Sequence, residues 1–155
     1  MRFKTVLPTM LLGTILAGCS TFQPDYYDCK SSVTSYAEGA RSSLLSEITN
    51  QNVEVRFNGV SARCYDSGDK VNVELGIGLK VLRDIAAGGD VAPVTVPLVA
   101  AIVDNTDNVT DTQGFVYNMQ FIQNVDVIYP LVRRDMTMPI GGRIILSLTP
   151  EVISQ

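Results

Sequence analysis

The sequence predicts an all-β fold, an antiparallel β-sandwich of about seven strands. Stretches of alternating apolar and polar residues dominate the chain after residue 50, and such alternation is typical of strands with one buried face. Gly, Asn, Asp and Pro separate these stretches at the short intervals expected of turns. No long run in the same region has the spacing of an amphipathic helix.

The first half of the predicted sandwich contains its most regular strand, over residues 70–82. Shorter strands are expected over 53–58 and 60–65, and Asn58-Gly59 between them predicts a turn or a β-bulge. Residues 66–69 form a turn of hairpin length that leads into strand 70–82. Apolar side chains alternate along that strand at Val71, Val73, Leu75, Ile77, Leu79 and Val81.

The second half is expected to add a central strand and three further strands. Residues 94–103 are almost wholly apolar, which predicts a strand buried on both faces. Pro97 within it cannot donate a backbone hydrogen bond, which predicts either a bulge or a position where the missing N–H would face the edge of the sheet. A polar loop is expected over 104–114. The last strands are expected over 115–127, with a bulge at 122–124, over 129–138 and over 143–148. From the alternation, we expect these side chains to point largely inward: Val73, Leu75, Ile77, Leu79, Val99, Ala101, Val103, Phe115, Tyr117, Met119, Ile144 and Leu146.

Two features of the fold stay open from the sequence alone. Residues 33–48 have apolar positions at helical spacing, whereas Gly39 and the many Ser and Thr residues disfavour a helix, so one or two edge strands are the alternative. The number and spacing of the strands predict an immunoglobulin-like sandwich, and a Greek-key barrel is the alternative architecture.

The N-terminal residues 1–18 have the features of a secretory signal peptide. Arg2 and Lys4 precede the apolar run 6–16, which is too short to span a bilayer about 30 Å thick. Leu16-Ala17-Gly18-Cys19 resembles the lipobox of bacterial lipoproteins at every position. The resemblance implies cleavage before Cys19, a diacylglycerol on its thiol and acylation of its amine, and several acyl chains make a stable anchor. The alternative is a soluble exported protein in which Cys19 is incidental.

The residues after the signal peptide are divided into a lipidated tether, 19–28, and a β-sandwich domain, 29–155. Ser20 follows the cysteine of the lipobox. In enterobacterial lipoproteins an Asp at that position retains the protein in the inner membrane. The resemblance therefore implies the periplasmic face of the outer membrane, and the inner membrane is the alternative.

The chain contains three cysteines, and two remain if Cys19 carries lipid. In an exported chain, Cys29 and Cys64 are then expected to form one disulfide. The alternative is a pair of reduced thiols with a redox role, although their spacing is not Cys-x-x-Cys.

The charge and composition exclude several functions. The net charge of −4 becomes −6 when Arg2 and Lys4 leave with the signal peptide, and an acidic protein is a poor partner for nucleic acid. The chain has no His, which excludes every mechanism that uses an imidazole base or ligand. We expect no cofactor.

A second resemblance covers residues 29–151. It consists of Cys29, the segment Gly59-Val60-Ser61-Ala62-Arg63-Cys64-Tyr65, the apolar strand 96–103 with Asp104, and the final segment 145–151. In this arrangement the chain is similar to a group of small proteobacterial lipoproteins to which no function is assigned. It departs from them at Leu98, where an aromatic residue is usual. The resemblance implies a disulfide-linked β-sandwich and export.

Three groups of residues are candidates for a site. Asp104, Asp107 and Asp111 form an oxygen-rich segment without the spacing of an EF-hand, so a solvated loop is favoured over calcium binding. Arg133-Arg134 could contact an acidic partner or a lipid headgroup, and solvated arginines are the simpler interpretation. Gly76-Ile77-Gly78 lies inside an alternating strand, which indicates close packing rather than a phosphate-binding loop.

These observations together predict a non-catalytic, lipid-anchored lipoprotein of the envelope with a binding or assembly role. Its expected partners are the membrane, through the lipid, and an envelope protein. The outward face of strand 70–82, with Asn72 and Glu74, is the candidate partner surface. The alternatives are a small envelope hydrolase that uses Asp or Glu and a small-ligand carrier with an apolar pocket between the sheets.

Replacing the cysteine of the lipobox tests the anchor. We expect Cys19→Ala to abolish palmitate labelling and processing, because no other thiol occupies the position to which the lipid would be attached. The measurement is metabolic labelling with a palmitate analogue followed by membrane fractionation. A variant that still takes up label and still sediments with membranes would contradict the prediction.

Overall fold

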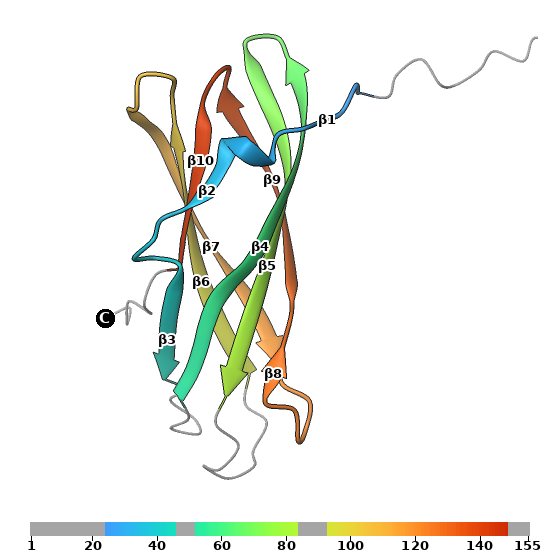
Figure 1. Ribbon diagram of the computed structural model, residues 1–155, viewed down its shortest axis with the longest axis vertical. Coiled ribbons are helices and arrows are strands. Elements are labelled where there is room, and N and C mark those ends of the chain that lie inside the picture. Colours follow the sequence, from blue (N-terminus) through green and yellow to red (C-terminus); the bar gives the residue numbers. More distant parts are fainter. Residues whose placement is uncertain (1–23, 46–51, 84–92, 149–155) are drawn as a thin grey trace, which may run out of the picture.

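A computed structural model describes residues 24–45, 52–83 and 93–148, which form two β-sheets packed face to face (Figure 1). The predicted antiparallel β-sandwich is therefore confirmed. Leu16, Ala17, Gly18 and Cys19 lie outside the described residues.

The described residues contain ten strands and one short 3-10 turn. Three strands have only two or three residues, so seven longer strands remain, in line with the predicted number. In chain order the elements are β1 (Tyr27–Asp28), the turn η1 (Lys30–Ser32), β2 (Val33–Ser35), β3 (Arg41–Leu45), β4 (Asn52–Ser67), β5 (Lys70–Arg83), β6 (Pro93–Val103), β7 (Val109–Gln120), β8 (Val127–Ile128), β9 (Leu131–Pro139) and β10 (Arg143–Leu148).

Two long hairpins, β4–β5 and β6–β7, lie in opposite sheets. The first sheet has the order β1-β4-β5-β8, with β3 also on β4 and β9 also on β5. The second sheet has the order β2-β10-β6-β7. All described pairs are antiparallel except β2 with β10.

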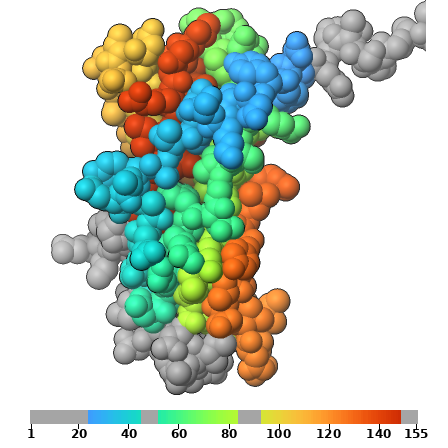
Figure 2. Space-filling view, in the orientation of Figure 1, coloured from blue at the N-terminus to red at the C-terminus, as the bar shows by residue number. Residues whose placement is uncertain are grey.

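The segment from β1 to β3 closes one side of the sandwich. It pairs with β4 through β1, crosses to β10 through β2, and returns to β4 through β3. Figures 1 and 2 show this segment, in blue and cyan, running across the face formed by β4 and β10. The predicted edge-strand interpretation of 33–48 is therefore confirmed for the described part, 33–45, and the helix is wrong there. Tyr27 and Asp28, which the sequence places in the tether, form β1.

The Cys29–Cys64 disulfide attaches this segment to β4, as predicted. The two Cα atoms are 5.8 Å apart, and both side chains are buried in the core. A bridge across 35 residues limits the freedom of the unfolded chain, which is the main way in which disulfides stabilise proteins.

The alternation predicted for β5 is confirmed, since every second side chain from Val71 to Val81 is buried. Ile144 and Leu146 are also buried as expected, whereas Phe115, Tyr117 and Met119 are only partly buried.

The predicted orientation of β6 is wrong at two positions. Val99 and Ala101 are half-buried on the outer face, and the inward side chains are Val94, Val96, Leu98, Ala100 and Ile102. Burial on both faces is also wrong, because nothing of the other sheet covers the outer face of a two-layer sandwich. The predicted inward position of Val103 is confirmed because the register shifts between Ile102 and Val103, so that two successive side chains are buried.

The predicted bulge at Asn58-Gly59 is confirmed by a register shift between Phe57 and Gly59, with φ +148° at the glycine. Gly78 lies opposite Gly59, and a Cβ on Gly78 would lie 3.3 Å from the Gly59 carbonyl oxygen. A Cβ on Gly76 would lie 2.5 Å from Ser61 Oγ. Both glycines of β5 therefore permit close packing, as the sequence indicated.

The boundaries predicted for β7 are wrong at both ends. The strand begins at Val109, inside the predicted loop, and ends at Gln120. Residues 121–126 cross to the other sheet instead of continuing the strand to 127. The nearly buried Arg83 explains the crossing, because its side chain donates hydrogen bonds to the carbonyls of Val125 (2.9 Å) and Ile122 (3.1 Å).

A matched pair of substitutions tests the orientation of β6. We expect Val96→Ala to lower the free energy of unfolding by about 2–4 kcal/mol, because it leaves a cavity between the sheets. Val99→Ala should cost about 1 kcal/mol or less, because the side chain is half-buried. Both changes remove the same atoms from the same strand, so denaturant titration compares burial alone. Equal losses would contradict the orientation.

Candidate binding cleft

The side of the sandwich opposite the β1–β3 segment is open. Its outer strands are β7 in one sheet and β9 in the other. On β7 the inward-facing side chains of Phe115, Tyr117 and Met119 pack against the core but are only half-buried. The core is therefore partly accessible along this side.

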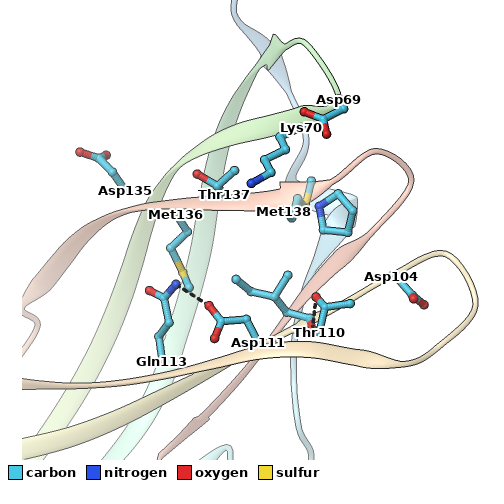
Figure 3. A pocket seen from close by; sticks show the side chains of 12 residues that line it. Asp69, Lys70, Asp104, Thr110, Asp111, Gln113, Asp135, Met136, Thr137 and Met138 are labelled. Atoms are coloured by element: carbon cyan, nitrogen blue, oxygen red, sulfur yellow. Dashed lines mark hydrogen bonds between the residues drawn. The ribbon is translucent and has the colours of Figure 1, made fainter.

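A cleft of about 610 Å³ lies at one end of the open side. Figure 3 shows Asp111 and Gln113 of β7 on one wall, and Met136 and Met138 belong to β9 on the other. Asp69 comes from the turn between β4 and β5 and Asp104 from the turn between β6 and β7, and the other lining residues belong to β5, β6, β7 and β9. The lining comprises Asp69, Lys70, Ile102, Asp104, Thr110, Asp111, Gln113, Asp135, Met136, Thr137, Met138 and Pro139.

The cleft combines an apolar floor with an acidic rim. Ile102, Met136 and Met138 are buried and form the apolar part. The lining includes four Asp residues and one Lys, Lys70. Asp135 is at an outward position of β9 and its carboxylate points away from the cleft (Figure 3), so the acidic rim consists of Asp69, Asp104 and Asp111. Clefts lined by one sign of charge concentrate ligands of the opposite sign. The arrangement is suited to a cationic group attached to an apolar body.

Asp104 organises the turn between β6 and β7. Its carboxylate accepts hydrogen bonds from Thr106 Oγ1 (2.7 Å), Thr106 N (2.8 Å) and Asn108 N (3.0 Å). These bonds, the one from the Thr106 hydroxyl above all, stabilise the ionised form and lower the pKa of Asp104. The carboxylate is therefore negative at neutral pH and fixed in position.

The other two acids of the predicted oxygen-rich segment have different partners. Asp107 forms an ion pair with Arg143 (2.9 Å), and Asp111 accepts a hydrogen bond from Gln113 Nε2 (3.0 Å; Figure 3). Within the ranges that the structure describes, no three acidic or cysteine side chains come together as metal ligands. The segment is a hairpin turn, as favoured from the sequence, followed by the first residues of β7.

The arginine pair Arg133-Arg134 is divided between the two faces of β9. The guanidinium of Arg134 lies 5.2 Å from the ring centroid of Phe115 on β7, within the range of a cation–π contact. Arg134 thus bridges the two outer strands of the open side. Arg133 is exposed.

The outward face of β5 is occupied by contacts with neighbouring strands. Glu74 accepts a hydrogen bond from the Tyr26 hydroxyl (2.6 Å) and forms an ion pair with Arg63. The Arg63 guanidinium also lies over the Tyr26 ring, 5.0 Å from its centroid. The Tyr26 bond is the main reason that the pKa of Glu74 is lowered. Asn72 accepts a hydrogen bond from Thr137 on β9.

Sequence reasoning did not find the cleft, because its lining comes from three separate parts of the chain and forms no motif. One signal was present. Asp111 and Gln113 occupy inward positions of β7, opposite Ile102 and Ala100, where the alternation calls for apolar side chains. A polar residue at an inward position often marks a functional surface.

Comparison of the chain with protein-family models, with curated proteins and with solved structures finds no match. No helix in the described part of the chain is long and apolar enough to cross a membrane. The candidate site is therefore argued from its own geometry.

The pKa of Asp104 tests the turn. We expect its carboxyl to titrate below the ordinary value for Asp, and Thr106→Val to raise that pKa by removing the hydroxyl donor. Because the folded-state pKa is depressed, the contribution of Asp104 to stability is present above the unfolded pKa of about 3.9 and is lost as pH falls through the lower folded value. Carboxyl-carbon NMR titration measures both proteins. An unchanged pKa in the variant would contradict the assignment.

Proposed function

We propose that this protein is a non-catalytic, lipid-anchored envelope lipoprotein that faces the periplasm from the outer membrane and binds a cationic partner in the cleft between β7 and β9. The observation that carries the binding role is the cleft itself, with carboxylates around a floor of Met136, Met138 and Ile102. The match of Leu16-Ala17-Gly18-Cys19 to a lipobox supports the anchor, and Ser20 supports the outer membrane.

The state of the carboxyl groups supports a binding role over catalysis. A carboxylic acid that donates a proton at neutral pH needs a raised pKa. Glu74 and Asp104, which line cavities, have lowered pKa values because hydrogen bonds stabilise their ionised forms. The chain also has no His to act as a base.

The disulfide supports an exported binding domain. It joins the start of the domain to β4, and the segment that it fixes closes the side of the sandwich opposite the cleft. A rigid scaffold with one accessible side suits a binding site, because walls that are already in place need not be ordered when the ligand binds.

A pair of small probes of opposite charge tests the cleft. We expect hexylamine to shift the methyl NMR signals of Met136 and Met138, and hexanoate of the same chain length to leave them unchanged, because only the amine complements the carboxylates. Asp111→Asn should weaken hexylamine binding about two- to fivefold, the amount expected for one exposed charge.

The matched control is Asp126→Asn, which changes the same charge in the exposed segment after β7, away from the cleft. It should leave hexylamine binding unchanged. Equal effects of hexylamine and hexanoate, or equal weakening by the two variants, would contradict a cationic site in the cleft.

A further inference from the structure

The strand β7 has a partner on one side only. Within the described ranges it pairs with β6, and its other edge faces the open side of the sandwich. It is 12 residues long, and Val109 and Val116 are 62% and 61% exposed. Peptide groups along such an edge lack strand partners and are a template for another strand.

The position of Pro97 identifies which peptide groups face outward. Pro97 lies directly opposite Val116 in the β6–β7 ladder. Residues opposite each other in an antiparallel ladder either exchange two N–H···O=C bonds or point these groups away from each other, in alternation. Pro97 has no N–H, so this pair is of the second kind. The N–H and C=O of Val116 therefore point to the free edge, as do those of the alternate residues Thr112, Gly114 and Asn118.

The two outer strands of the open side differ in how they are protected. In β9 the central residues Arg133, Arg134 and Asp135 are charged, and the strand ends at Pro139. Charges and proline are the usual means by which proteins prevent pairing at an edge. In β7 the one charged residue is Asp111, and there is no Lys, Arg or Pro. This contrast indicates that β7 is kept available for a partner.

The charge around this edge determines the chemistry of that partner. The cleft beside the first half of β7 has carboxylates from Asp69, Asp104 and Asp111 against the ammonium of Lys70, and the guanidinium of Arg134 lies farther along β7, at Phe115. A second copy of the chain would bring the same carboxylates toward its own, and the chain carries a net charge of −4. A basic segment complements the cleft.

We propose that the free edge of β7 accepts an extended basic polypeptide segment as an additional strand, with Lys or Arg side chains of that segment in the acidic cleft. The inference rests on the proposed function, since it names the class of partner that occupies the same cleft. Backbone bonds to Thr112, Gly114, Val116 and Asn118 supply affinity, and the carboxylates select for positive charge.

The experiment uses the full chain in detergent micelles and three acetylated nine-residue peptides. The first alternates Lys with Val and Thr, the second has Glu in place of Lys, and the third is the basic peptide with every backbone N–H methylated. We expect the basic peptide alone to bind and to slow amide hydrogen exchange at Thr112, Gly114, Val116 and Asn118. The amides of Gln113, Phe115 and Tyr117, which point toward β6, should change little.

Two variants of one residue provide a matched control. Val116→Pro removes an outward N–H that β6 does not use, and should weaken binding of the basic peptide about tenfold through this bond and its neighbours in the ladder. Val116→Thr keeps the N–H and the branched shape, and should bind as the unchanged protein does. Unchanged exchange in β5 verifies that each variant is folded, and the methylated peptide tests the same bonds without altering the protein.

Several outcomes would overturn the proposal. Equal binding of the methylated peptide, or binding without protection of the four alternate amides, would exclude strand addition. Equal binding of the acidic peptide would exclude the role of charge. Protection of the four amides that rises with protein concentration, without peptide, would identify a second copy as the occupant. If hexylamine binds in the cleft but the basic peptide does not bind, strand addition fails while the proposed function stands. If hexylamine does not bind in the cleft either, both strand addition and the proposed function are contradicted.

Discussion

The apolar contact between the two sheets holds this domain together, and it is complete at the centre and incomplete at one side. At the centre, β5 faces β6 and β10 through Ile77, Leu79, Leu98, Ile144 and Leu146, none of which is more than 1% exposed. Because burial of apolar area is the dominant favourable term in folding, these central strands set where the other elements can lie. The outer strands differ in their surroundings: the β1–β3 segment covers the side formed by β4 and β10, whereas the side formed by β7 and β9 is open.

The segment from β1 to β3, which is irregular, covers one side of the sandwich. The chain from β1 to β3 contributes only short strands, which alone would be marginally stable. The Cys29–Cys64 bond fixes the start of that segment, and pairing with β4 and β10 fixes the rest. On the other side, a cation–π contact between Arg134 and Phe115 spans the gap between the outer strands. The site is found where closure is least complete.

The orientation of a strand could be predicted from the sequence only where polar residues alternate with apolar ones. In β5, polar side chains between Val71 and Val81 set the phase of the alternation, and the buried face followed directly. In β6, nearly every residue is apolar, so the sequence contains no signal for which face is inward, and Val99 was assigned to the wrong one. The end of β7 depended on Arg83, which is distant in sequence from the carbonyls of 122 and 125. The cleft depends on long-range topology in the same way, because its lining comes from strands and turns of both sheets that only the two-sheet arrangement brings together.

The contacts of Tyr26 and Tyr27 determine how the domain would stand on a bilayer. Their hydroxyls bond to Glu74 and Asp66, beside the β4–β5 turn at the cleft end of the sandwich. From Cys19 to Tyr26 the chain advances seven residues, which reach at most about 24 Å when fully extended. A lipid on Cys19 would therefore keep the cleft end toward the membrane and the opposite end, with β8, away from it. The partners that reach the cleft would then be those that extend along or out of the bilayer surface, within a gap a few nanometres high.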